Sequence, residues 1–101
     1  MFRLKEGSTQ TDQEAVKEGL LELARSVPEI RSYEIGQDLL LESGQKHPFG
    51  PNRHVAWTAI FDNTQDYQTY NESSAHQEFL ALLKPLVDGS SRAAIQYDRD
   101  D

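Results

Sequence analysis

Apolar residues recur along this chain in two patterns, every second residue as in a strand and every third or fourth as in a helix. The order in which these patterns follow one another constrains the fold most. Alternation of apolar and polar residues, typical of half-buried strands, predicts strands over residues 2–7, 30–36 and 92–98. A fourth segment, 54–62, is β-branched and aromatic with apolar residues on both faces, which predicts a strand inside a covered sheet.

The first helical segment lies between the first two predicted strands. Thr11 is suited to an N-cap, and Glu14 three residues later completes a capping box. Pro28 ends the helix because it forces the preceding residue out of helical geometry. One face of this helix is apolar and predicts burial of Val16, Leu20, Leu23, Ala24 and Val27.

The second helical region follows the strongest strand and is interrupted. Asp62 or Asn63 is expected to cap a short helix over residues 64–70. A polar break follows, after which Ser74 and Gln77 predict a second capping box and a helix that starts at Ala75.

The order of elements is therefore β-α-β-β-α-β, which predicts an α+β, ferredoxin-like fold over one domain, residues 1–101. We expect a four-stranded antiparallel sheet with the helices on one face. The other face would keep apolar side chains from the second, third and fourth strands. A second copy packed face to face would cover it, which predicts a homodimer.

Charge and composition exclude several classes of partner. The chain has 17 acidic and 10 basic residues and a net charge of −7, which argues against nucleic acid and anionic membranes. Cysteine is absent, so neither a disulfide nor a thiolate metal site can form. No apolar run approaches the roughly 20 residues of a membrane span. We expect a soluble cytoplasmic protein with no cofactor.

Several segments together resemble the stress-responsive dimeric α/β-barrel family. They are "FRLKEG" at the start, "VPEIRSYEIG" after the first helix, "AIFDNTQDYQTYNESSAHQEFLALLKPLV", and "AAIQYD" at the end. The resemblance implies homodimers in which two sheets close into a barrel. Against the family pattern, the first strand is expected to be truncated at Met1, which removes a histidine that often helps form a pocket. Ser73 and Ser74 replace a usual His-Pro pair.

The resemblance also implies a candidate catalytic pair. In olivetolic acid cyclase, a family member that cyclises a linear polyketide by aldol condensation, a tyrosine and a histidine with this spacing act on the substrate. These positions correspond to Tyr70 and His76. The break after Tyr70 places His76 in a first helical turn, where the helix dipole disfavours imidazolium and favours a general base. A phenol beside it could donate to a developing enolate.

A structural role for this pair is equally natural, because a histidine at a helix start can bond to backbone while a tyrosine packs below it. The remaining histidines, His47 and His54, have no ligand spacing with His76, so no metal site is predicted. Trp57 is expected in the core or a dimer interface. The segment 37–53 is expected to be a long exposed loop or a pocket lid.

Three functional hypotheses remain open at this point. The first is a small non-catalytic homodimer with a stress-associated role that binds a small apolar ligand. The second is a cofactor-independent, aldol-type polyketide cyclase that uses Tyr70 and His76. The third is a cofactor-free monooxygenase or a haem-degrading protein of the wider dimeric α+β barrel superfamily, although the helical position of His76 suits an axial haem ligand poorly.

Overall fold

The computed structural model describes residues 1–99 and contains four short strands and three α-helices in ferredoxin-like order. The strands are β1 (Arg3–Leu4), β2 (Ser32–Gln37), β3 (Val55–Ile60) and β4 (Val87–Asp88). The helices are α1 (Gln10–Ser26), α2 (Thr64–Glu72) and α3 (Ser74–Leu83), and a 3₁₀ turn, η1, covers Gly89–Ser91.

The strands pair as two antiparallel ribbons rather than as one continuous sheet. β2 pairs with β3 over six residue pairs, from Ser32 opposite Ile60 to Gln37 opposite Val55. β1 pairs with β4 over two residue pairs only. A single bridge between Phe2 and Val55 joins the ribbons, which gives the strand order β4-β1-β3-β2. The predicted four-stranded sheet is thus formed in part.

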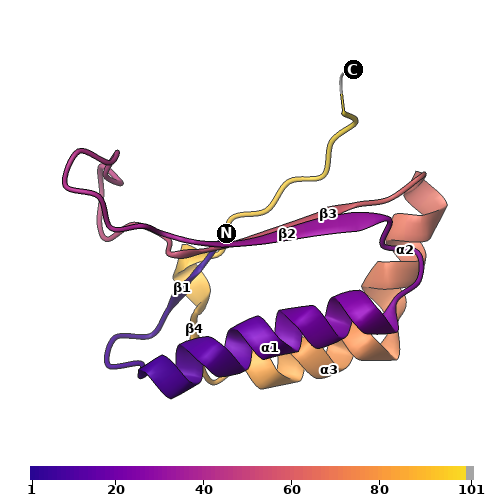
Figure 1. Ribbon diagram of the computed structural model, residues 1–101, viewed down its shortest axis with the longest axis horizontal. Helices are drawn as coiled ribbons and strands as arrows, with labels where there is room; N and C mark the ends of the chain where they lie inside the picture. Colours follow the sequence, from indigo (N-terminus) through magenta and orange to yellow (C-terminus); the bar gives the residue numbers. More distant parts are fainter. Residues whose placement is uncertain (100–101) are drawn as a thin grey trace.

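The helices form one layer against one side of the strands. α1 and α3 lie side by side below the β2–β3 ribbon, and α2 leads from the end of β3 into α3 (Figure 1). The core lies between these layers and includes every apolar residue predicted for the buried face of the first helix except Ala24. Its members are Phe2, Leu4, Val16, Leu20, Leu23, Val27, Val55, Tyr70, Phe79, Leu83 and Val87.

Two of the predicted helix caps are wrong by one or two residues. α1 is capped by Thr9, whose side chain and that of Asp12 form the capping box that Thr11 and Glu14 were expected to make. α3 is capped by Ser73 rather than Ser74. A second serine or threonine within two residues of the true cap satisfies the same pattern, so sequence alone does not distinguish them. Of the two caps predicted for α2, Asp62 and Asn63, the structure has Asn63.

The predicted last strand over residues 92–98 is also wrong. The fourth strand forms earlier, at Val87–Asp88, and η1 follows it. Ala93 and Met1 exchange two backbone hydrogen bonds of 2.9 Å, and the chain beyond Ala93 forms no strand within the described residues. A strand pattern needs a neighbouring backbone to become a strand, and no described strand pairs with residues 94–98.

The segment between β2 and β3 is the long exposed loop that was predicted. It has no helix or strand from Asp38 to His54. Its apolar residues do not enter the core: Leu39 and Leu40 are each 79% exposed, and Phe49 is 92% exposed.

Candidate functional site

A single serine holds the corner between α2 and α3. The backbone N–H of Ser73 donates to the carbonyl of Tyr70, and its hydroxyl donates to the same carbonyl at 2.7 Å. That hydroxyl oxygen also accepts the backbone N–H of His76 at 3.1 Å. Because Ser73 has an extended backbone between two helices, the chain turns sharply there. The rings of Tyr70 and His76 consequently meet with centroids 4.7 Å apart.

Tyr70 is the buried member of this pair. Its side chain is 8% exposed, and its hydroxyl oxygen accepts a hydrogen bond from the indole N–H of Trp57 at 3.3 Å. Burial raises the pKa of the phenol above its ordinary value, so the hydroxyl stays protonated at neutral pH. Because the bond from Trp57 uses an oxygen lone pair, the hydroxyl proton of Tyr70 remains available to donate.

His76 lies half-buried at the start of α3, and a carbonyl fixes its tautomer. Nδ1 lies 3.0 Å from the backbone oxygen of Asn71. A carbonyl can only accept, so Nδ1 carries the proton in the neutral ring and Nε2 keeps its lone pair. This is the arrangement in which a histidine can act as a base through Nε2.

An aromatic cluster surrounds the pair. The ring centroid of Tyr70 lies 5.1 Å from that of Phe61 and 6.1 Å from that of Tyr67. Trp57 packs against the same core from β3, as expected for a core residue. The corner therefore combines a phenol donor, a free imidazole nitrogen and an apolar wall. The same contacts also stabilise the turn, so the geometry is compatible with both roles predicted from the sequence.

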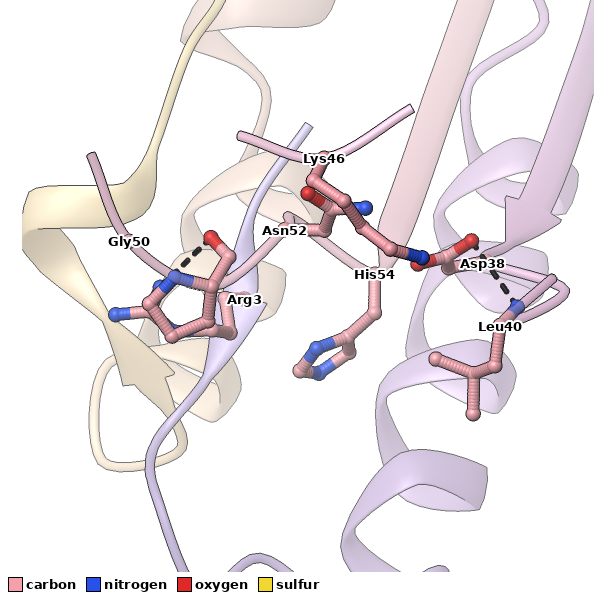
Figure 2. Close-up of a pocket in the computed structure, with 8 residues that line it drawn as sticks. Arg3, Asp38, Leu40, Lys46, Gly50, Asn52 and His54 are labelled. Atoms are coloured by element: carbon pink, nitrogen blue, oxygen red, sulfur yellow. Dashed lines mark hydrogen bonds between the residues drawn. The ribbon is translucent and has the colours of Figure 1, made fainter. Parts of the chain in front are cut away.

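Two cavities lie at the opposite end of β3, beside the long loop. One, of about 380 Å³, is lined by Arg3 of β1 and by residues of the loop, including Asp38 and Lys46. The second, of about 240 Å³, lies next to it and shares Asp38, Asn52 and His54. In Figure 2 the imidazole of His54 lies between Arg3 on one side and Asp38 and Leu40 on the other.

His54 has a structural role that the sequence analysis missed. Its Nε2 accepts the backbone N–H of Leu4 at 3.1 Å, which joins β1 to the residue that precedes β3. Burial, with a smaller contribution from the positive charge of Arg3, lowers the pKa of His54 below its ordinary value. A polar residue at the start of the predicted strand 54–62 was the available signal.

The structure also places the other features considered from the sequence. His47 lies in the loop, away from His76, and the described residues contain no group of three histidine or acidic side chains arranged to hold a metal ion. Within residues 1–99, no helix has the length and apolar character needed to span a membrane.

Comparison with known proteins identifies the family. The model of the "Stress responsive A/B Barrel Domain" matches residues 1–98. The chain belongs to the stress-responsive A/B barrel domain family. The resemblance inferred from the sequence segments is thus confirmed.

Solved structures similar to this A/B barrel domain share its fold. A dimeric ferredoxin-like protein of unknown function from Thermobifida fusca YX is 27% identical, with a TM-score of 0.71 over 87% of this chain and 76% of that one. A dimeric protein of unknown function from Bacteroides fragilis is 22% identical, with a TM-score of 0.71 over 97% and 89% of the two chains. A hypothetical Arabidopsis thaliana protein is 16% identical, with a TM-score of 0.68 over 96% and 87%. No curated protein matches the A/B barrel sequence.

Proposed function

We propose that this A/B barrel domain acts as a homodimer that pairs through the helix-free face of its strands and binds a small, largely apolar ligand. The observation that carries the proposal is the one-sided fold: α1 and α3 cover one face of the β2–β3 ribbon and leave the other without a layer (Figure 1). The two dimeric structures to which the chain is similar support the same assembly.

The residues on the helix-free face suit close approach of a second copy. Residues directly opposite in an antiparallel pair share a face, so Gly36 and Ala56 lie together on it, as do Ser32 and Ile60. These are small or apolar, and Ile60 and Ala56 are half-buried even in one chain. Only the pair of Glu34 and Thr58 is exposed and polar throughout.

The pair of Glu34 and Thr58 provides a sharp test of the dimer. Thr58→Arg places a guanidinium opposite Glu34 within one chain, which favours the strand pair while adding bulk and charge to the proposed interface. We expect the parent chain to have the mass of a dimer in light scattering and Thr58→Arg to have the mass of a folded monomer. Thr69→Arg, on the exposed side of α2, is the matched control and should stay dimeric. A monomeric parent chain, or a dimeric Thr58→Arg, contradicts the proposal.

The tautomer of His76 favours a second candidate function, an aldol-type cyclase acting on a polyketide-like small molecule without a cofactor. Nε2 of His76 would remove a proton next to a carbonyl, and the Tyr70 hydroxyl would donate to the enolate oxygen that develops. The ring of Tyr70 packs against those of Phe61 and Tyr67, so carbon-rich surface borders the pair.

A linear β-polyketone is the probe for this second function. We expect the chain to accelerate its cyclisation, His76→Gln to lower kcat at least about 100-fold and Tyr70→Phe about 10-fold. His47→Gln, in the loop, is the control and should keep full activity. If cyclisation proceeds at the uncatalysed rate, or if activity survives His76→Gln, the cyclase proposal is wrong. Tyr70 and His76 then have only a structural role in the corner.

A further inference from the structure

The larger cavity beside the long loop has charges of both signs on its wall. Its volume of about 380 Å³ lies in the range of roughly 300–1,000 Å³ that is usual for small-molecule sites. Lys46 and Asp38 both line it, and within residues 1–99 neither side chain has an ion-pair partner. A ligand that carries both charges itself would pair with each of them.

Hydrogen bonds between side chains and backbone fold the loop into the wall of this cavity. The amide nitrogen of Asn52 donates to the carbonyl of Gln45 at 2.9 Å, and its amide oxygen accepts the backbone N–H of His47. Nζ of Lys46 donates to the carbonyl of Leu41 at 2.9 Å. An ammonium group has three donors, so Lys46 keeps two of them for a ligand. The loop therefore positions charged groups although it contains no helix or strand.

His54 supplies an uncharged donor to the same cavity. Its Nε2 accepts the backbone N–H of Leu4, so Nδ1 carries the proton of the neutral ring. Burial lowers the pKa of His54 below its ordinary value, which keeps the ring neutral at pH 7. Within the described residues Nδ1 has no hydrogen-bond partner, and the ring lies between Arg3 and Asp38 (Figure 2). The Nδ1–H group is thus available to a ligand.

The remaining charges of the wall nearly balance. The guanidinium of Arg3 forms an ion pair with Asp88, which lies outside the cavity lining. Oδ1 of Asp38 accepts the backbone N–H of Leu40 at 3.2 Å, and Oδ2 is left to accept from a ligand. With Arg3 paired, one positive charge on Lys46 and one negative charge on Asp38 remain. A wall of this kind favours a zwitterion over a simple anion.

We propose that this cavity binds a small α-amino acid with an apolar side chain. Its carboxylate accepts from Lys46 and from the Nδ1–H of His54, and its ammonium donates to Asp38. Leu40 and Pro51 line the space for the apolar side chain. The inference goes beyond the homodimer and the cyclase and rests on neither. Because Lys46 and Asp38 are exposed, we expect a dissociation constant on the order of 1 mM.

Titration of the isotope-labelled chain with leucine, followed through its amide NMR shifts, tests the proposal. Isocaproate is the matched ligand, since it has the same carbon skeleton and carboxylate but lacks the ammonium. We expect leucine to shift the amides of residues 38–54 in a saturable way. Isocaproate should bind about five-fold more weakly, because Asp38 offers it no partner.

Two substitutions separate the two ends of the ligand. Asp38→Asn keeps an oxygen for the N–H of Leu40 but removes the charge, so leucine should bind about five-fold more weakly and isocaproate should lose nothing. Lys46→Met should weaken the binding of both ligands by about five-fold. Lys17→Met, on the exposed side of α1, makes the same charge change away from the cavity and should bind both ligands as the parent chain does.

A preference for leucine over isocaproate that Asp38→Asn abolishes supports the amino acid site. Equal binding of the two ligands, or affinities that survive both Asp38→Asn and Lys46→Met, overturns it. The absence of saturable shifts in residues 38–54, including shifts centred on Tyr70 and His76 instead, also overturns it. Light scattering on the same samples keeps the proposals apart: a monomeric chain that binds leucine in this way removes the homodimer and supports the amino acid site.

Discussion

The two ribbons of the fold are held together by different means. β2 and β3 form a regular ladder of six pairs, so backbone groups satisfy one another along its length. β1 and β4 form two pairs, a backbone bond from Lys5 to Leu86 follows them, and side chains add further bonds. The hydroxyl of Ser91 accepts the N–H of Arg3 at 2.8 Å, and His54 accepts that of Leu4.

This difference shows that a short ribbon can be stabilised where its ladder is interrupted. Ser91 is 4% exposed, and its hydroxyl also donates to the carbonyl of Asp88 at 2.6 Å. Through its bonds to Arg3 and Asp88, Ser91 links η1 to both strands. Arg3 and Asp88 add an ion pair, and a hydrogen bond from Ser90 is the largest cause of the lowered pKa of the Asp88 carboxyl. The short ribbon therefore depends on particular side chains, whereas the long ribbon depends mainly on backbone pairing.

Loss of core volume should weaken both ribbons together and have the largest effect. Leu20 is 1% exposed and belongs to the cluster that also contains Leu4 of β1 and Val55 of β3. We expect Leu20→Ala to lower the free energy of unfolding by about 2–5 kcal/mol in urea titration. Leu40→Ala, at a side chain 79% exposed, should change it by less than about 0.5 kcal/mol. Equal effects would show that α1 is not the layer that unites the ribbons.

Removal of the Ser91 hydroxyl should separate the two ribbons. Ser91→Ala leaves the N–H of Arg3 without its acceptor, at a cost of about 1–3 kcal/mol. Amide hydrogen exchange should speed up in β1 and β4 and stay unchanged through β2 and β3. Ser43→Ala, in the exposed loop, is the control. Uniform acceleration across all four strands contradicts an independent short ribbon.

Protonation of His54 in acid should weaken the short ribbon. This loss of stability should be smaller than those caused by Leu20→Ala and Ser91→Ala. Its pKa is lowered in the folded state, so the unfolded chain binds the proton more readily, and stability falls as pH drops through the ordinary histidine range, roughly 7 to 5. The protonated ring cannot accept the N–H of Leu4, and its charge meets that of Arg3, with Asp38 opposing.

Urea titrations across that pH range, compared between variants, measure the contribution of His54. His54→Gln keeps an acceptor near Leu4 but does not titrate, so its stability should fall less with acid than that of the parent chain. Parallel curves for His54→Gln and the parent chain would assign the acid sensitivity to other groups.

The corner at Tyr70 and His76 shows which features of the candidate site could be predicted from the sequence. The polar break was visible as a run of residues with poor helical preference, and it predicted that the two side chains could meet although six residues separate them. No sequence pattern indicated that Trp57 bonds to the phenol or that the Asn71 carbonyl selects the tautomer. Those contacts depend on how α2 turns against β3, which no local pattern encodes.

The sequence by itself determined the order of elements, the apolar face of α1, the start of α2 to within one residue and the family, because these follow from local periodicity, capping chemistry and motif spacing. Tertiary structure decided which strand-like segments became strands. Residues 92–98 carry a strand pattern but form none, while Val87 and Asp88 become β4 because Leu4 and Arg3 lie opposite them. A strand needs a partner for its hydrogen bonds, and whether that partner is present is a long-range property of the fold.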